Sequence, residues 1–363
     1  MTSSRLFFLG SAALAMACGG KVDETVVGDS ALDTGEPLPD SAPLPDVGPV
    51  PSGPKPPPRP AAATSGGATK WFAFDSLRLG VTVRATGASS PSAWKEYGYD
   101  FDSRITTADD SVTSRNSCRR VSGSPQKVLA DGNLGIDNNF GQHVMAVVKS
   151  LKSDSEETVN SSIRSGNITM LLRLDNVGPD DNADVPGALF LAAPLGGTPT
   201  FTESDKWPID SASVDASKEA KAKFKGYMAG GMWVSGDFGT GSFALLLPFI
   251  SGSAASFHLE SGVITVRVAD GSNGTIAGGA TTDSVKIGFT PLMKQFGICP
   301  GNATYDQVVA TLTQSADLVA GAPQMQNPSV TCNTLSMGLG FSMKPTGMPN
   351  TISTLKPPLD PCK

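Results

Sequence analysis

The stretch KWFAFDSLRLGVTVR, residues 70–84, carries the clearest strand signal in the chain. Aromatic residues crowd its first half, 71–74, and β-branched valine and threonine are prominent in its second half, 79–83. Residues of these types pack well on the pleated surface of a sheet. We therefore expect the two halves to be neighbouring strands, paired as the first hairpin of a β-rich domain.

Further strand signals follow along the same domain. Tyr97, Tyr99 and Phe101 alternate with glycine or acidic residues, and this period of two predicts a strand with one buried face. Other strand-like runs lie at 168–174, 188–192, 224–234, 242–249 and 263–268. The sequence DGSNG at 270–274 predicts a tight turn after the last of these runs.

Helical periodicity is rarer than strand periodicity. Apolar residues recur at helical spacing in 140–151 and in 304–320. Residues 155–165 predict another helix, with Ser153 or Asp154 as its N-cap. Because strands outnumber helices, we expect a mainly β fold, an antiparallel β-sandwich of jelly-roll type with a few accessory helices at one edge.

The first eighteen residues have the composition of an export signal. Arg5 precedes an apolar run, 6–17, that is too short to span a bilayer and ends at Cys18. We therefore predict that residues 1–17 are a cleaved signal peptide. The sequence LAMAC at 14–18 resembles the lipobox of bacterial lipoproteins, which implies that Cys18 carries a lipid and anchors the chain to a membrane. Plain secretion is the alternative, because Ala-Met-Ala also suits an ordinary signal peptidase.

The composition changes sharply after this cysteine. Residues 18–69 are rich in Pro, Gly, Ser, Ala and Asp, which predicts a disordered, extended tether without a core of its own. Residues 70–363 are long enough to form one β-rich ectodomain. The segment GIDN at 135–138 resembles a stretch that recurs in uncharacterised bacterial lipoproteins, which implies a shared fold. We expect an exported protein, lipid-anchored at the outer membrane or the cell surface.

The chain has five cysteines, an odd number for an exported protein. Lipidation of Cys18 leaves four, enough for two disulfides, and four cysteines allow three pairings. Cys299 and Cys332 bracket the last predicted helix, so a bridge between them would clip this helix against the sheet and leave Cys118 to pair with Cys362. We favour that arrangement, and the other two pairings stay open.

Two acidic loops are candidate metal sites. In DGNLGIDNN, residues 131–139, oxygen-bearing side chains recur around glycines, as a loop that folds around a hard cation such as Ca²⁺ requires. The second loop, DNVGPDDNAD, covers residues 175–184. The candidate ligands are Asp131, Asn133 and Asp137 in the first loop and Asp175, Asp180 and Asp184 in the second. Neither loop matches the EF-hand pattern, and turn formation alone is the alternative explanation for both.

The sequence offers few catalytic groups, and we assign no catalytic residue. His143 and His258 are the only histidines, so a histidine-rich zinc site cannot form, and a structural or surface role is the simpler expectation for both. Neither a Gly-x-Ser-x-Gly motif nor a phosphate-binding loop occurs. The formal net charge of −6 argues against a nucleic-acid partner.

Carboxylates and tryptophans leave one enzymatic alternative open. Asp100 with Asp102, or Glu203 with Asp205, could supply the two carboxylates of a glycoside hydrolase, although solvent-facing positions are the simpler expectation. Three tryptophans could stack on sugar rings or pack in the core: Trp94, Trp207 and Trp233.

These features favour a cell-envelope protein that presents a β-sandwich as a binding or structural module. We expect Ca²⁺ as its cofactor, the membrane as its partner through the N-terminal lipid, and a surface glycan as its ligand. The competing hypothesis is a secreted carbohydrate-active hydrolase that uses two carboxylates in a Trp-lined groove.

Overall fold

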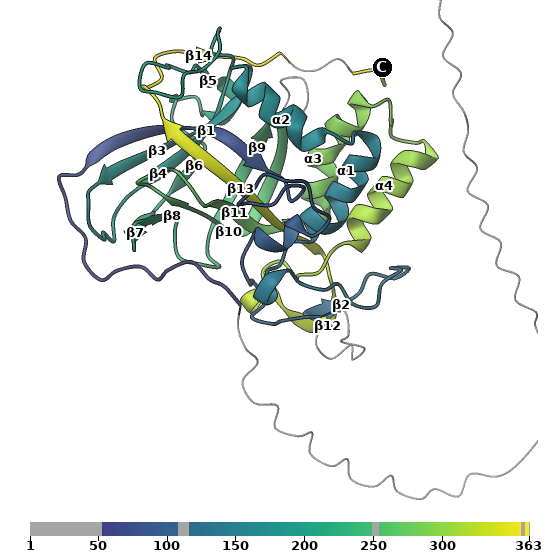
Figure 1. Cartoon of the computed structure of the whole chain (residues 1–363). Coiled ribbons are helices and arrows are strands. Elements are labelled where there is room, and N and C mark those ends of the chain that lie inside the picture. The colour runs from purple at the N-terminus through teal and green to yellow at the C-terminus, as the bar shows by residue number, and fades with distance from the viewer. Residues whose placement is uncertain (1–52, 108–115, 249–253, 357–359, 363) are drawn as a thin grey trace, which may run out of the picture. The chain divides into compact units, whose positions relative to one another are not determined.

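The computed structural model describes residues 53–107, 116–248, 254–356 and 360–362. The predicted signal peptide, Cys18 and most of the predicted tether lie outside these residues. The described part is mainly β, with helices packed beside a large sheet (Figure 1). Within it, no helix combines the length and the apolar character that a membrane span requires.

Twelve strands form the large sheet. Their order is β14-β5-β4-β3-β1-β13-β11-β10-β8-β7, with β6 also paired to β4 and β9 to β10. The pairing is antiparallel except between β14 and β5. The strands are β1 Ala68–Arg78, β3 Thr169–Val177, β4 Gly187–Ala192, β5 Ile209–Asp210, β6 Ala222–Phe224, β7 Tyr227–Ala229, β8 Met232–Val234, β9 Ser242–Pro248, β10 Ala254–Arg267, β11 Gly274–Thr281, β13 Thr334–Pro345 and β14 Ile352–Ser353. A separate parallel pair joins β2 (Cys118–Arg119) to β12 (Asn327–Thr331).

The sheet folds over itself into two layers. β9 pairs with β10, and it also contacts β3, β4 and β6, which belong to the other half of the strand order. The side chains between the layers and beneath the helices form the main core, where Phe74 stacks on Phe341 with ring centroids 4.0 Å apart. The predicted β-sandwich with accessory helices is confirmed.

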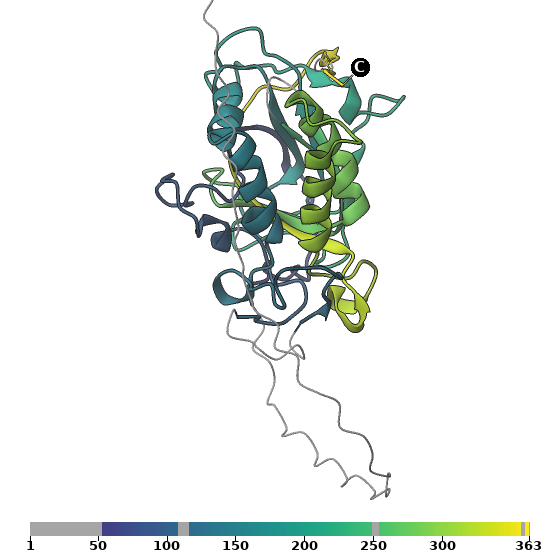
Figure 2. The ribbon, with the colours of Figure 1, turned by 90° about the vertical axis from the view of Figure 1, so that its right-hand side faces the viewer.

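Helices cover one side of the sheet, as the turned view shows (Figure 2). A short π-helical turn, η4 (Phe140–Val144), leads into α1 (Met145–Leu151), and α2 (Ser155–Arg164) follows. α3 spans Thr282–Gln295 and α4 spans Ala303–Gln314. Among the described residues, 3-10 turns lie at η1 Ala93–Glu96, η3 Asn133–Gly135, η5 Ser211–Ser213 and η7 Pro323–Met325.

The helices predicted at 140–151 and 155–165 are confirmed, whereas the one predicted at 304–320 ends early, at Gln314. α3 was not predicted, because Gly288 and Pro291 interrupt its pattern with two poor helix formers. Gly288 has a packing reason: a Cβ there would lie 2.5 Å from the Ser256 carbonyl oxygen of β10. The glycine therefore lets the helix approach the sheet closely.

The predicted first hairpin at residues 70–84 is wrong. β1 is a single strand that lies between β3 and β13, so both of its edges pair with distant segments. Beyond its end, the backbone N–H groups of Leu79 and Val81 donate to Glu156 Oε2, at 2.6 and 3.1 Å. A buried carboxylate on α2 thus takes the donors that a second strand would have used in a ladder.

The strand predicted at Tyr97–Asp102 is also wrong. This segment is irregular and crosses β13, where the Tyr97 carbonyl lies against Gly338. Its aromatic side chains are buried as predicted, but its backbone bonds to other loops and to side chains. Asp100 N donates to the Pro54 carbonyl at 3.1 Å, and Phe101 N donates to Asp137 Oδ2 at 2.6 Å. The alternation reflects burial on both sides of a loop.

The remaining strand predictions fare better. The runs at 168–174, 188–192, 242–249 and 263–268 fall in β3, β4, β9 and β10, and the turn at 270–274 leads into β11. The run at 224–234 is three short strands, because Gly230 and Gly231 both have positive φ and turn the chain between β7 and β8.

Residues 53–67, which the sequence assigned to the tether, lie along the domain as an extended strap leading into β1 (Figure 1). Arg59 Nε lies 2.8 Å from Asp237 Oδ1, and its guanidinium carbon lies 4.5 Å from the ring centroid of Tyr227. The Tyr227 hydroxyl donates to the Pro57 carbonyl at 2.7 Å. The ordered domain therefore begins earlier than residue 70.

We expect Gly338→Ala to destabilise the fold by about 2 kcal/mol or more, because the added Cβ would overlap the backbone of the crossing loop, which cannot rotate away as a side chain can. Denaturant unfolding measures the change. Gly178→Ala is the matched control, since no atom lies within 4 Å of a Cβ built there. Equal stability of the two variants would contradict the close crossing.

Candidate metal centre

Five aspartates from three parts of the chain converge below the helices. Asp100 and Asp102 come from the crossing loop, Asp131 and Asp137 from the first acidic loop, and Asp317 follows α4. Asp100, Asp102 and Asp137 are buried, and each offers a carboxylate oxygen within 4.8 Å of the other two. Carboxylate oxygens grouped in this way are the ligands that hard divalent cations take.

Backbone N–H groups hold three of these carboxylates in place. Asp137 Oδ2 accepts from Phe101 N at 2.6 Å, and Asp102 Oδ1 accepts from Arg104 N at 2.8 Å. Asp131 Oδ2 accepts from Thr106 N at 2.6 Å. Each carboxylate uses one oxygen in these bonds, so the loops fix its direction while leaving the second oxygen for other partners.

The strap also reaches this cluster. Gly53 N donates to Asp100 Oδ2 at 2.5 Å, and Asp100 N donates to the Pro54 carbonyl at 3.1 Å. The strap is therefore bonded directly to one of the buried carboxylates.

Asp317 is held from β13. Its two oxygens accept from Ser336 N at 2.8 Å and from Ser336 Oγ at 2.6 Å. Asn139 also hydrogen-bonds the Asp317 carboxylate through its side chain. The amide oxygen of Asn139, a residue only 4% exposed, has no hydrogen-bond partner among the described residues. Leaving a buried acceptor without a donor costs free energy.

The cluster is electrostatically strained. Burial raises the pKa of Asp102 to about 7 and that of Asp131 to about 9, and neighbouring carboxylates add to both shifts. Burial likewise holds the pKa of Asp137 well above its usual range and raises that of Asp317 to about 6. The carboxyls therefore bind protons far more readily than free aspartate, and a bound cation would compete with those protons.

Arg120 supplies positive charge at the rim. Its guanidinium donates to the carbonyls of Gln314 and Ala316, at the end of α4, and its charge acts on Asp317. Burial lowers the pKa of Arg120. One guanidinium, directed at carbonyl groups, does not balance the converging carboxyls.

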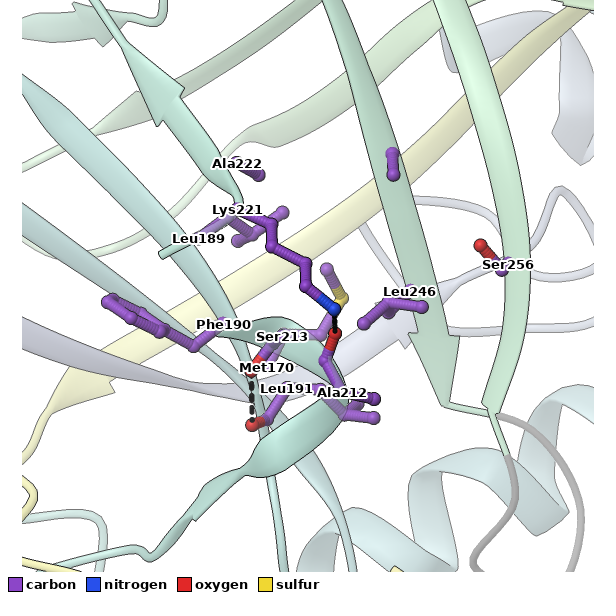
Figure 3. A pocket seen from close by; sticks show the side chains of 11 residues that line it. Met170, Leu189, Phe190, Leu191, Ala212, Ser213, Lys221, Ala222, Leu246 and Ser256 are labelled. Carbon is purple, nitrogen blue, oxygen red and sulfur yellow. Dashed lines mark hydrogen bonds between the residues drawn. The ribbon is translucent and has the colours of Figure 1, made fainter. Parts of the chain in front are cut away.

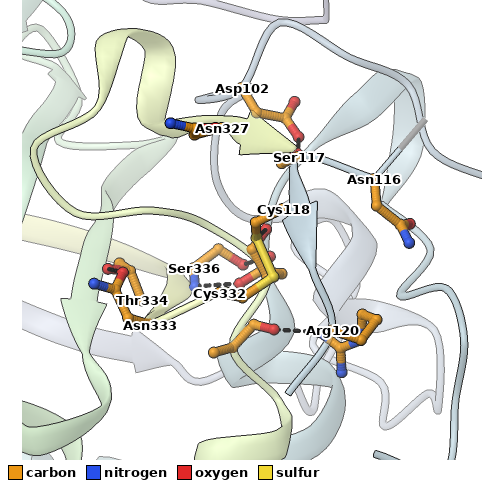
Figure 4. The surroundings of a disulfide bond; sticks show 12 residues. Asp102, Asn116, Ser117, Cys118, Arg120, Asn327, Cys332, Asn333, Thr334 and Ser336 are labelled. Carbon is orange, nitrogen blue, oxygen red and sulfur yellow. Dashed lines mark hydrogen bonds between the residues drawn. A yellow bond between two sulfur atoms is a disulfide. The ribbon is translucent and has the colours of Figure 1, made fainter. Parts of the chain in front are cut away.

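A cavity of about 20 Å³ opens beside the carboxylates. Asp102, Asp131, Asp137 and Asp317 line it together with Ser117, Arg120 and both cysteines of a disulfide. Figure 4 shows Ser117 pointing at Asp102, with the disulfide and Arg120 beside them. About 10–15 Å³ of such volume is enough for one water molecule, so this cavity suits an ion or a water and is too small for a sugar ring.

Two of the three candidate ligands from the first acidic loop thus lie in the cluster. Asp131 and Asp137 face the other aspartates, but Asn133 is exposed at the start of η3. Of the other members, Asp100 and Asp102 were expected to face solvent and are instead fully buried. Asp317 was missed, because nothing near it in sequence links it to the acidic loops.

The second acidic loop does not form a comparable cluster. Asp175 pairs with Arg173 Nε at 3.1 Å and accepts from Thr69 Oγ1 at 2.9 Å. Asp180 and Asp184 are exposed. Turn formation accounts for this loop.

The other candidate groups have structural surroundings. Trp94, Trp207 and Trp233 are buried, so they present no face to a sugar. Asp205 accepts from Phe201 N at 2.6 Å, while Glu203 is exposed.

All four predicted disulfide cysteines are bridged, but the favoured pairing is wrong. The bonds are Cys118–Cys332 and Cys299–Cys362. The pairing follows from the sheet: Cys118 lies in β2, which pairs with β12, and Cys332 follows directly after β12. Sequence spacing could not show this contact.

Comparison of the chain with family models, with curated proteins and with solved structures gave no match.

Proposed function

We propose that this chain is an exported binding or structural module whose β-rich domain is stabilised by a divalent cation, and that this cation is Ca²⁺. The observation that carries the proposal is the group of three buried carboxylates, Asp100, Asp102 and Asp137, whose oxygens lie within 4.8 Å of one another. Calcium binds oxygen ligands at 2.3–2.6 Å, so oxygens that share one ion lie up to about 5 Å apart.

The chemistry of the cluster favours Ca²⁺ over other metals. All of its candidate ligands are oxygens, whereas zinc and copper sites use histidine or cysteine. Mg²⁺ demands a near-ideal octahedron and keeps several waters, which a cavity of about 20 Å³ does not hold. Asp131 and Asp317, which line the same cavity, would supply further oxygen ligands.

We further propose that the domain is displayed at the cell surface or outer membrane through a lipid on Cys18. Two disulfides support an oxidising, extracytoplasmic location. The proposed ligand is a surface glycan, which would bind elsewhere than on Trp94, Trp207 and Trp233, because these tryptophans are buried. The hydrolase alternative is weaker at Asp100 and Asp102, because the cavity beside them does not admit a sugar ring.

Asp137→Asn tests the cation site. The amide oxygen of Asn can still accept from Phe101 N, while one negative charge at the centre of the cluster is lost. We expect Ca²⁺ to raise the melting temperature of the full-length protein by several degrees, since saturation at a hundred times Kd adds about 3 kcal/mol, and we expect the variant to lose most of this shift. Thermal unfolding in Ca²⁺ and in chelator measures it.

Asp180→Asn is the matched control, because it removes one exposed charge from the second acidic loop. It should respond to Ca²⁺ as the natural protein does. If no divalent cation stabilises the natural protein at any concentration, the cation proposal is wrong.

A further inference from the structure

A second cavity, of about 190 Å³, lies apart from the aspartates, between β9 and the β4–β6 pair (Figure 3). β9 pairs with β10 along one edge, and its other edge faces β4 and β6 without a ladder between them. The walls are mostly apolar and come from both layers: Met170, Leu189, Leu191, Ala222, Ala244 and Leu246. An apolar cavity of this kind disfavours polar groups in its interior.

One cation stands at the mouth of this cavity. Figure 3 shows Lys221 reaching over the apolar walls toward η5, where its Nζ donates to the Ala212 carbonyl at 2.8 Å. An ammonium group has three donors, so two stay free for another acceptor. Among the described residues, no carboxylate lies within ion-pair distance of Lys221. By contrast, Lys223, two residues further along in β6, pairs with Glu219 at 3.6 Å.

The lining also contains two serine hydroxyls, which differ in whether they already donate a hydrogen bond within the protein. Ser213 Oγ donates to the Asp210 carbonyl at 2.8 Å, so it is already satisfied. Ser256 is exposed on β10, on the far wall from Lys221, and can donate a further hydrogen bond. The site therefore combines an apolar interior with one unpaired positive charge and one hydroxyl at its rim, the usual composition of a small-molecule site.

We propose that this cavity binds a medium-chain alkanoate, with the carboxylate on the Lys221 ammonium and the alkyl chain between Met170 and Leu246. The volume sets the size: a cavity of about 150 Å³ holds benzene, so about 190 Å³ holds an alkyl chain of roughly six carbons. The charge sets the head group, because the ammonium has no anionic partner within the described domain. This inference is independent of the cation site.

Titration calorimetry of the full-length protein with hexanoate, and separately with neutral 1-hexanol, tests the assignment. We expect saturable hexanoate binding, at least tenfold weaker in Lys221→Met, whereas hexanol affinity should change less than twofold. Leu246→Trp, which fills the cavity, should abolish binding of both. Lys223→Met is the matched control and should bind hexanoate as the natural protein does.

The outcomes separate the two parts of the assignment. Equal hexanoate affinity in the natural protein and in Lys221→Met would overturn the role of the ammonium, and with it the carboxylate. Binding that survives in a folded Leu246→Trp protein would place the ligand elsewhere. Absence of saturable hexanoate binding to the natural protein would overturn the proposal outright. Melting temperatures of all variants establish that each is folded.

Discussion

In chelator, the melting temperature of the full-length protein should fall by about 10 °C or more as the pH rises from 6.5 to 9. Unfolded aspartates titrate near pH 3.9. In the folded protein, burial raises the pKa of Asp102 to about 7 and that of Asp131 to about 9. Across this range the native state therefore binds more protons than the unfolded state, so stability is lost as the pH rises.

The magnitude follows from the same shifts. A carboxyl that is protonated in the folded state and ionised in the unfolded state loses about 1.4 kcal/mol of stability per pH unit until its folded-state pKa is reached. Between pH 6.5 and 9, Asp131, whose pKa is about 9, therefore loses about 3 kcal/mol, and Asp102, whose pKa is about 7, adds less than about 1 kcal/mol. In a chain of this size about 1 kcal/mol moves the melting temperature by 2–4 °C. His143 acts in the opposite sense below pH 6.5, because burial lowers its pKa. The slope should therefore be steepest above that pH.

Saturating Ca²⁺ should flatten this pH profile, because a bound cation stabilises the ionised carboxylates that otherwise repel one another. Asp131→Asn should flatten it in part without any metal, since it removes one of the charges. A profile in chelator that is flat between pH 6.5 and 9 would show that the aspartates are not buried together as described.

The origin of this cluster explains how far the sequence could predict it. Asp131 and Asp137 lie six positions apart in a glycine-containing loop, and local spacing was enough to select both. Asp100 and Asp102 were noticed as a pair, but the alternating pattern suggested a strand with a solvent face. A loop crossing β13 buries both sides of the alternation, and only tertiary contacts reveal that.

Long-range contacts also explain the other errors. The aromatic-rich β1 reads as half of a hairpin because the segment after it in the sequence, 79–83, is rich in β-branched residues, yet its real partners are β3 and β13. α3 reads as a broken segment because it contains two poor helix formers, Gly288, which its close approach to β10 requires, and Pro291, which is exposed. The sandwich itself was predictable, since alternation and turn residues are local properties, whereas strand order, disulfide pairing and Asp317 depend on what meets across the fold.

Removal of the Cys118–Cys332 bridge should strongly lower both the stability of the fold and its response to Ca²⁺, because this bridge closes a long loop and lines the cation cavity. It joins residues 214 positions apart, for which the loop-entropy estimate is about 5 kcal/mol. Ser117, next to Cys118, donates to Asp102, and Cys118 Sγ lies 3.1 Å from the Asp317 carbonyl. Loss of the bridge should therefore loosen two of the carboxylates together.

The paired substitution Cys118→Ser with Cys332→Ser should thus lower the free energy of unfolding by about 4–5 kcal/mol and also weaken the stabilisation by Ca²⁺. Cys299→Ser with Cys362→Ser is the matched control. It opens a loop of sequence separation 63, worth about 4 kcal/mol, but ties the C-terminal residues to the end of α3, away from the cavity lining. Both pairs should lose stability in chelator, and only the first should lose its response to Ca²⁺. An equal Ca²⁺ response in the two pairs would mean that the bridge beside Asp102 supports the fold without shaping the cation site.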